Sequence, residues 1–120
     1  MAFFWQSAAP GSLDAEIRAV SEDHGSECRV LLSGRITIDS SPGLRALLLR
    51  RLGTPGCEIL TADLGDVAYV DTSGIAILVE VLKAARNQGK LFHLSRLQDR
   101  PRFLLEATRL LPLFEKPAPK

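Results

Sequence analysis

The chain has little of what several specialised protein classes require. It has only two cysteines in 120 residues, Cys28 and Cys57, and no CxxC pair, which excludes a disulfide-built secreted domain and favours a reducing cytoplasm. No apolar run is long enough for a membrane span or a signal peptide. The 15 basic and 14 acidic residues give a net charge of +1, so no global field attracts nucleic acid directly.

The motifs of catalysis and cofactor binding are also missing. Neither GxxxxGK[ST] nor GxGxxG occurs, so no glycine loop is offered to a nucleotide phosphate. His24 and His93 have no partner at metal-ligand spacing, and we expect no metal and no cofactor. Ser73 lacks the flanking glycines of a GxSxG motif. To act as a nucleophile it would need a general base, and the fold would have to place His93 beside it. We therefore expect that the chain is not an enzyme.

Three parts of the chain can be distinguished by composition. Residues 1–12 are expected to form a flexible lead, 13–115 one domain, and 116–120 a tail. The role of Phe3, Phe4 and Trp5 in the lead stays open. The basic residues concentrate after residue 80, with 9 Lys and Arg against 3 Asp and Glu, which predicts a dipolar surface if these charges stay together in the fold.

Hydrophobic periodicity predicts alternating strands and helices. Strands are expected over 14–20, 28–34, 58–70 and 91–94, with a hairpin turn at 22–26 and a turn at Gly65 and Asp66. Helices are expected from Ser40 or Ser41 to Gly53, over 73–88 before Gly89, and from a cap at Asp99 onward, whereas 111–114 is expected as an edge segment. This order favours an α/β domain with a partly parallel sheet after a leading hairpin.

Residues 69–75 carry the most informative pattern. There a strand ends and the most regular helix begins, and Asp71, Thr72 and Ser73 are all good N-cap residues, so helix capping alone explains them on one interpretation. On the other, a phosphate on Ser73 would meet the free N–H groups of the helix start and the positive end of its dipole. The added charge next to Asp71 would alter a partner contact without unfolding the domain. Gly74 leaves room for a kinase or partner to approach.

The segment 70–75, preceded by 64–67 and followed by Leu78 and Val79, resembles the phosphoacceptor loop of STAS domains, in particular of bacterial anti-sigma factor antagonists. Residues 32–36 and 87–91 resemble two further segments of that family. The resemblance implies an α/β STAS fold, in which a mixed sheet of four to five strands has three or four helices packed mainly on one face. Thr37 stands where the family often has an aspartate.

The resemblance implies a phosphorylation-controlled binding switch in transcription regulation. Unphosphorylated Ser73 would permit binding to an anti-sigma factor that is also the serine kinase and supplies the nucleotide, and phosphorylation would release it. The expected partner-binding residues are Asp71, Thr72, Ser73, Gly74, Ile75 and Ile77. Within this set Asp71 would orient the loop and Thr72 would cap the helix. A phosphatase and a second copy of the chain are further candidate partners.

Two points stay open in the sequence. Ile77, Val81 and Ala84 form an apolar row, which is either an exposed docking strip or a side buried by neighbouring elements. The alternative function is a cytoplasmic STAS subunit of a lipid or solute transporter, in which Thr72 would make the contact and no kinase would be needed.

Overall fold

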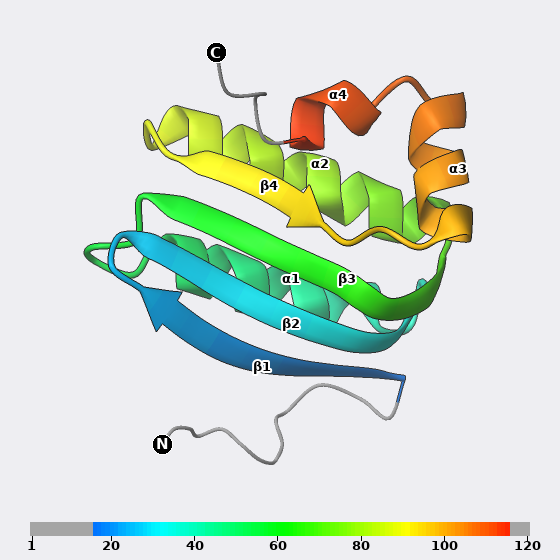
Figure 1. Ribbon diagram of the computed structural model, residues 1–120, viewed down its shortest axis with the longest axis horizontal. Helices are drawn as coiled ribbons and strands as arrows, with labels where there is room; N and C mark the ends of the chain where they lie inside the picture. The colour runs from blue at the N-terminus through cyan, green and yellow to red at the C-terminus, as the bar shows by residue number, and fades with distance from the viewer. Residues whose placement is uncertain (1–15, 116–120) are drawn as a thin grey trace.

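The computed structural model describes residues 16–115, which form a four-stranded sheet and four helices (Figure 1). In chain order the elements are β1 (Ile17–His24), β2 (Glu27–Ile36), α1 (Ser41–Leu52), β3 (Ile59–Val70), α2 (Thr72–Asn87), β4 (Leu91–Ser95), α3 (Asp99–Ala107) and α4 (Leu111–Phe114). The spatial order is β1-β2-β3-β4, with β1 antiparallel to β2 and the other pairs parallel. The predicted α/β fold with a mixed sheet is confirmed.

The leading hairpin is present, but its turn is shorter than predicted. The residues 22–24 belong to β1, where His24 pairs with Glu27, and only Gly25 and Ser26 connect the strands. Gly25 has a φ of 64°, a left-handed conformation that suits a two-residue hairpin loop. The polar residues at the end of β1 stay in the strand because β1 is an edge strand whose side chains are mostly exposed there.

The third strand runs without a break through the predicted turn at Gly65 and Asp66. Both residues lie inside β3, and the pairing of β2 with β3 shifts register between Leu31 and Ser33 and again after Gly34. Such irregularities bend a strand and increase its twist without ending it. Gly34 of β2 has a φ of 117°, and a β-carbon there would lie 1.9 Å from the carbonyl oxygen of Glu16, the residue just before β1. Only glycine therefore fits at this position of β2.

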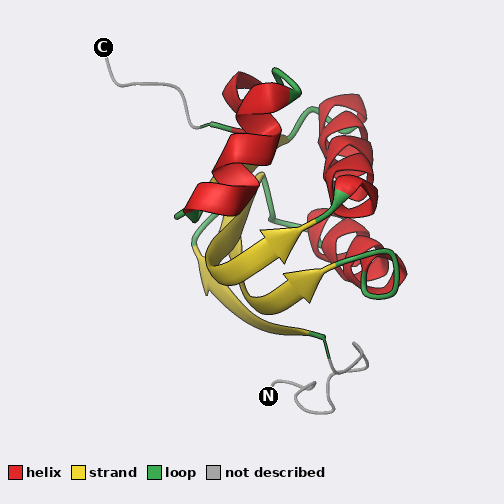
Figure 2. Ribbon diagram, turned by 90° about the vertical axis from the view of Figure 1, so that its right-hand side faces the viewer, coloured by secondary structure: helices red, strands yellow, loops and turns green. Residues whose placement is uncertain are grey.

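The helices α1 and α2 cover one face of the sheet (Figure 2). They contribute buried residues at helical spacing, and β2 and β3 contribute alternate buried residues to the same core. The core residues of the two helices are Leu44, Leu47, Leu48, Leu52, Ile75, Ile77, Leu78, Val81, Leu82 and Ala85. Both free cysteines, Cys28 and Cys57, are buried in this core.

The second apolar row of α2 is not an exposed docking strip. Ile77 is 8% exposed and Val81 is fully buried, and Ala84 packs against the core. The reason is that α2 contacts α1 on one side as well as β3 and β4 of the sheet. The interpretation that this row is buried by neighbouring elements is therefore the correct one.

The C-terminal part closes the core beside β4. The segment 111–114, predicted as an edge segment, is the short helix α4, and Phe114 meets Phe92 edge to face with ring centroids 5.9 Å apart. Pro112 suits the first turn of a helix, and in a strand it could not donate to a sheet ladder. Gln98, not Asp99, is the N-cap of α3. The predicted lead 1–12, with Phe3, Phe4 and Trp5, and the tail 116–120 lie outside the described residues.

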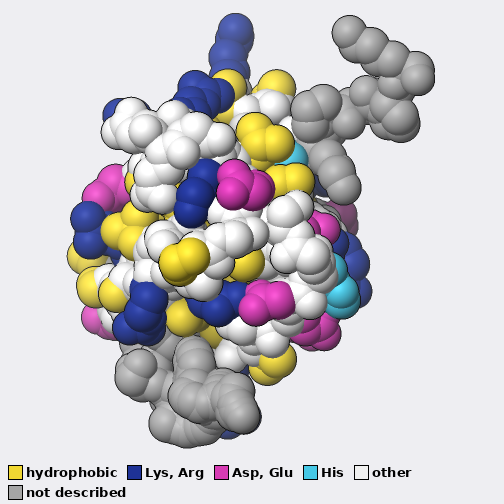
Figure 3. Space-filling model, turned by 90° about the vertical axis from the view of Figure 1, so that its left-hand side faces the viewer, with side chains coloured by type: hydrophobic (Ala, Val, Ile, Leu, Met, Phe, Trp, Pro, Cys, Tyr) yellow, Lys and Arg dark blue, Asp and Glu magenta, His cyan; other side chains and the backbone are white. Residues whose placement is uncertain are grey.

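The surface shows no single-sign face at the amino ends of β2, β3 and β4, where acidic, basic and apolar side chains are interspersed (Figure 3). The charge asymmetry along the chain is thus not gathered on that end of the molecule. None of the helices within 16–115 is long and apolar enough to span a membrane.

Candidate functional site

The segment 69–75, which carries the most informative sequence pattern, lies where β3 ends and α2 begins. This is the end of the sheet that faces the viewer in Figure 2. Thr72 is exposed and is the first residue of α2, and Ser73 beside it is half-buried. Gly74 and Ile75 are buried, the latter with 7% exposure. The structure thus brings two hydroxyl groups to the surface, while Ile75 and Ile77 lie mainly in the core.

Asp71, and not Thr72, is the N-cap of α2. One oxygen of its carboxylate, Oδ1, accepts a hydrogen bond from the backbone N–H of Gly74 at 3.0 Å. Its backbone is extended, with φ −100° and ψ −175°, as N-cap residues usually are. The predicted cap at Thr72 is therefore wrong by one residue, because an aspartate with the correct backbone conformation precedes it.

The second oxygen of Asp71 reaches a different part of the chain. Oδ2 accepts a hydrogen bond from the backbone N–H of Ile38 at 3.1 Å, and the N–H of Asp71 donates to the carbonyl of Ile36 at 3.0 Å. Asp71 therefore orients its loop, as the resemblance implied, by joining the start of α2 to the loop between β2 and α1. No local pattern in the sequence points to Ile38, an apolar residue between Thr37 and Asp39 that is 69% exposed.

The loop between β2 and α1 is held by its own hydrogen bonds. The N–H of Thr37 donates to Ser40 Oγ at 2.8 Å, and that hydroxyl donates to the carbonyl of Arg35 at 2.8 Å. The N–H of Asp39 donates to Thr37 Oγ1 at 3.1 Å. Thr37, at the place where the family often has an aspartate, is thus a buried structural residue here.

Gly74 faces the core and not the solvent. A β-carbon on Gly74 would lie 2.6 Å from Ile36 Cγ2 and 2.8 Å from Val70 Cγ1. The glycine therefore lets the first turn of α2 pack closely on the ends of β2 and β3. The expectation that it clears a path for a partner is wrong, because the space it leaves is already filled by these two side chains.

Ser73 lies in the first turn of α2, where a helix has backbone N–H groups without intrahelical acceptors. No acidic residue lies in that turn, so the positive end of the helix dipole is not already neutralised from within the helix. A phosphate on Ser73 would find hydrogen-bond donors there, and it would also lie near the Asp71 carboxylate. The geometry suits a modification that changes charge and leaves the helix in place.

His93 cannot serve Ser73 as a base. It pairs with Thr61 in the sheet, whereas Ser73 follows Val70, nine residues further along β3. At about 3.3 Å per residue these nine residues span about 30 Å, which is far beyond hydrogen-bond reach. Within 16–115 no group of three His, Cys, Asp or Glu side chains is placed to hold a metal ion.

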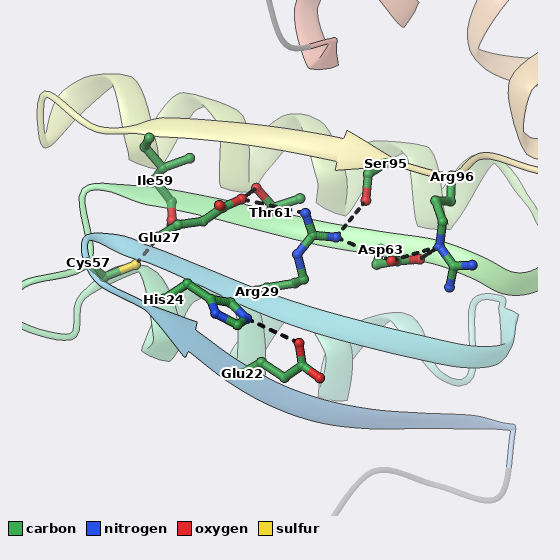
Figure 4. Close-up of polar contacts among 10 residues, drawn as sticks. All are labelled: Glu22, His24, Glu27, Arg29, Cys57, Ile59, Thr61, Asp63, Ser95 and Arg96. Atoms are coloured by element: carbon green, nitrogen blue, oxygen red, sulfur yellow. Dashed lines mark hydrogen bonds and ion pairs between the residues drawn. The ribbon is translucent and has the colours of Figure 1, made fainter.

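A polar network lies on the face of the sheet opposite α1 and α2 (Figure 4). Asp63 is buried and pairs with Arg96 at 2.9 Å and Arg29 at 3.3 Å, and it accepts from the N–H of Gly65 at 2.8 Å. Burial raises the pKa of this carboxyl, but the bonds from Arg96 and Gly65 and the two positive charges outweigh burial, so the pKa is lowered overall. The network ties β2, β3 and the end of β4 together.

The mixed sheet, the two helices on one face and the hydroxyl loop at the start of α2 together define a protein of the STAS class. A family model described as "Mlab, STAS domain" matches residues 20–113. The chain belongs to the STAS domain family, and the resemblance stated from its sequence is confirmed.

Solved structures of anti-sigma factor antagonists share the fold. One from Mycobacterium paratuberculosis is 23% identical, with 82% of each chain covered and a TM-score of 0.69. Unphosphorylated SpoIIAA is 12% identical over 86% of this chain and 90% of its own, with a TM-score of 0.71. Phosphorylated SpoIIAA of Bacillus is 12% identical over 86% and 93%, with a TM-score of 0.65. At these identities the similarity establishes the fold.

Proposed function

We propose that the chain is a cytoplasmic, non-enzymatic anti-sigma factor antagonist whose partner binding is controlled by phosphorylation of Ser73. Its partner is an anti-sigma factor that is also a serine kinase and brings its own nucleotide. The observation that carries the proposal is the half-buried Ser73 in the first turn of α2, next to the Asp71 cap, in a chain of the STAS family.

The proposed switch acts through charge. A phosphoserine adds about −1.5 to −2 at neutral pH, and here that charge would lie one turn or less from Asp71 and the exposed Thr72. A partner surface complementary to the unmodified loop would then face repulsion and the cost of desolvating a phosphate. The fold would stay intact, because the hydroxyl of Ser73 does not cap the helix.

The test is capture from a lysate of the native organism with ATP present. Wild-type protein, Ser73→Ala and Ser73→Asp are used as bait, and bound proteins and phosphorylated residues are identified by mass spectrometry. We expect wild type and Ser73→Ala to retain an ATP-binding serine kinase, Ser73→Asp to lose it, and phosphate to appear on Ser73 of the wild type. Equal capture by all three baits, with no phosphate on Ser73, would refute the proposal.

A second candidate function is a STAS subunit on the cytoplasmic face of a lipid or solute transporter. The observation that favours it is the greater exposure of Thr72, since Ser73 is half-buried. In this function Thr72 makes the contact and no kinase is required. Thr72→Arg would then release the protein from native membranes, whereas Ser73→Ala would leave it bound. The switch function predicts no membrane-bound pool in either case.

A further inference from the structure

We propose that Asp71 transmits the phosphorylation state of Ser73 to the loop between β2 and α1, where Ile38 supplies an apolar contact for the same partner. This inference rests on the proposed function and adds a positioning residue and a second contact to it. It starts from one carboxylate that makes two hydrogen bonds to segments 36 residues apart in the chain, at Ile38 and at Gly74.

The two hydrogen bonds of Asp71 depend on one side-chain orientation. Oδ1 is held by the N–H of Gly74 and Oδ2 by the N–H of Ile38. A carboxylate that turns to improve one of these bonds lengthens the other. The position of Ile38 is thus tied to the state of the first turn of α2.

A phosphate on Ser73 would disturb this orientation in two ways. Its oxygens compete with Asp71 for N–H groups at the helix start, where Gly74 is the donor already in use. Its charge also repels the carboxylate of Asp71 across the short distance between the N-cap and the first turn of α2. Both effects weaken the bond from Ile38, which lies at the surface and is the more easily lost of the two.

Loss of that bond would alter the surface at Ile38 and leave the rest of the loop in place. Thr37 and Asp39 keep their bonds to Ser40 Oγ and Thr37 Oγ1, which do not involve Asp71. Ile38 therefore becomes the free part of the loop.

Ile38 is the exposed apolar residue best placed to contact a partner docked on Ser73. The other large apolar side chains exposed within 16–115 are Val20, Leu91, Phe103 and Leu113, and none of them lies in the loop that is hydrogen-bonded to the cap of α2. Ile38 is apolar and 69% exposed, so a fitting partner surface has an apolar pocket for its side chain, and a phosphate next to that pocket would have to be desolvated on binding.

The experiment measures amide hydrogen exchange of the purified full chain by NMR. The variants are Ser73→Asp and, as an uncharged control of the same size, Ser73→Asn. We expect exchange at Ile38 to rise about tenfold in Ser73→Asp and to stay near the wild-type rate in Ser73→Asn, while the amides of Thr37 and Asp39 change little. Equal rates at Ile38 in all three proteins, or equal increases in both variants, would overturn the inference without affecting the proposed function.

A second variant, Asp71→Ser, separates capping from the tether to Ile38. Serine caps a helix as well as aspartate does, but its single oxygen cannot also reach the loop. We expect fast exchange at Ile38, a nearly unchanged melting temperature and about tenfold weaker binding of the captured kinase. Ile38→Ser should weaken binding similarly and Phe103→Ser, an equally exposed control, should not. Wild-type binding by Asp71→Ser and Ile38→Ser would overturn the inference, while failure of the wild type to bind any kinase would overturn the function itself.

Discussion

Gly74 and Ile36 lie so close together that a β-carbon on the glycine would be 2.6 Å from Ile36 Cγ2. Ile36 ends β2 and is fully buried, and Gly74 lies in the first turn of α2. Their contact sets how closely the helix that carries Ser73 packs on the sheet. The glycine at the start of α2 is in this way a packing residue.

Gly74→Ala should destabilise the protein although alanine is the better helix former. The new methyl group must displace Ile36 or Val70, and overpacking of this kind costs about 1–3 kcal/mol. Alanine gains only ~1 kcal/mol over glycine in helix propensity. The cost in packing therefore equals or exceeds the gain in propensity. We expect a lower urea midpoint with an unchanged m-value. Gly53→Ala is the control, since its β-carbon would meet only ordinary contacts, the nearest at 3.5 Å. Equal midpoints for the two variants would contradict this interpretation of the contact.

Ser73→Asp should leave the fold intact. An acidic residue in the first turn of α2 gains from the helix dipole and loses from repulsion with Asp71, so the free energy of unfolding should change by less than about 1 kcal/mol. Thermal unfolding followed by circular dichroism measures the change. A variant that is already unfolded at room temperature would mean that the hydroxyl of Ser73 has a structural role, and loss of partner binding could then not be assigned to charge.

Asp63→Asn should reduce stability at neutral pH and remove part of the acid sensitivity. Because the pKa of Asp63 is lowered in the folded state, its contribution is present above the ordinary aspartate value of about 3.9 and is lost as the pH falls through the folded pKa. We expect the variant to be about 1–3 kcal/mol less stable than wild type at pH 7. The difference should shrink as the pH falls below about 4, where the unfolded chain begins to take up the proton, and it should be lost once the folded carboxyl is protonated as well.

The control for this prediction is Asp66→Asn, which changes an exposed aspartate on the same strand. Urea midpoints of the three proteins at a series of pH values from neutral to strongly acidic test the prediction. A constant difference between wild type and Asp63→Asn across this range would show that the carboxylate charge of Asp63 does not stabilise the fold.

The two cysteines should resist thiol reagents in the folded protein. The pKa of the Cys28 thiol is raised to about 12, mainly by burial and to a smaller extent by the hydrogen bond and the charge of the neighbouring Cys57. The reactive thiolate is therefore scarce at pH 8. Cys57 is only 1% exposed. We expect an aromatic disulfide reagent to label neither thiol in the native state and both in denaturant. Rapid labelling of the native protein would indicate that this part of the core opens readily.

Much of the fold could be predicted from local sequence signals. Both α1 and α2 could be located to within a residue or two. Their apolar spacing identified the helices, the serine before Pro42 marked the start of α1, and Gly89 marked the end of α2. The errors occurred where tertiary contacts overrode local preference. Polar residues 22–24 remained in β1 through pairing with β2, Gly65 and Asp66 stayed inside β3, and Leu111–Phe114 became a helix whose last ring packs on Phe92.

The sequence by itself determined the class of the protein and the position of its candidate site, because strand and helix periods, caps and the 70–75 motif are local properties of the chain. Only the tertiary structure decided the roles within the site. The cap belongs to Asp71, the glycine packs on Ile36, and Ile38 joins the site from another loop. These roles depend on contacts between segments distant in the chain, and such contacts leave no periodic pattern in a single sequence.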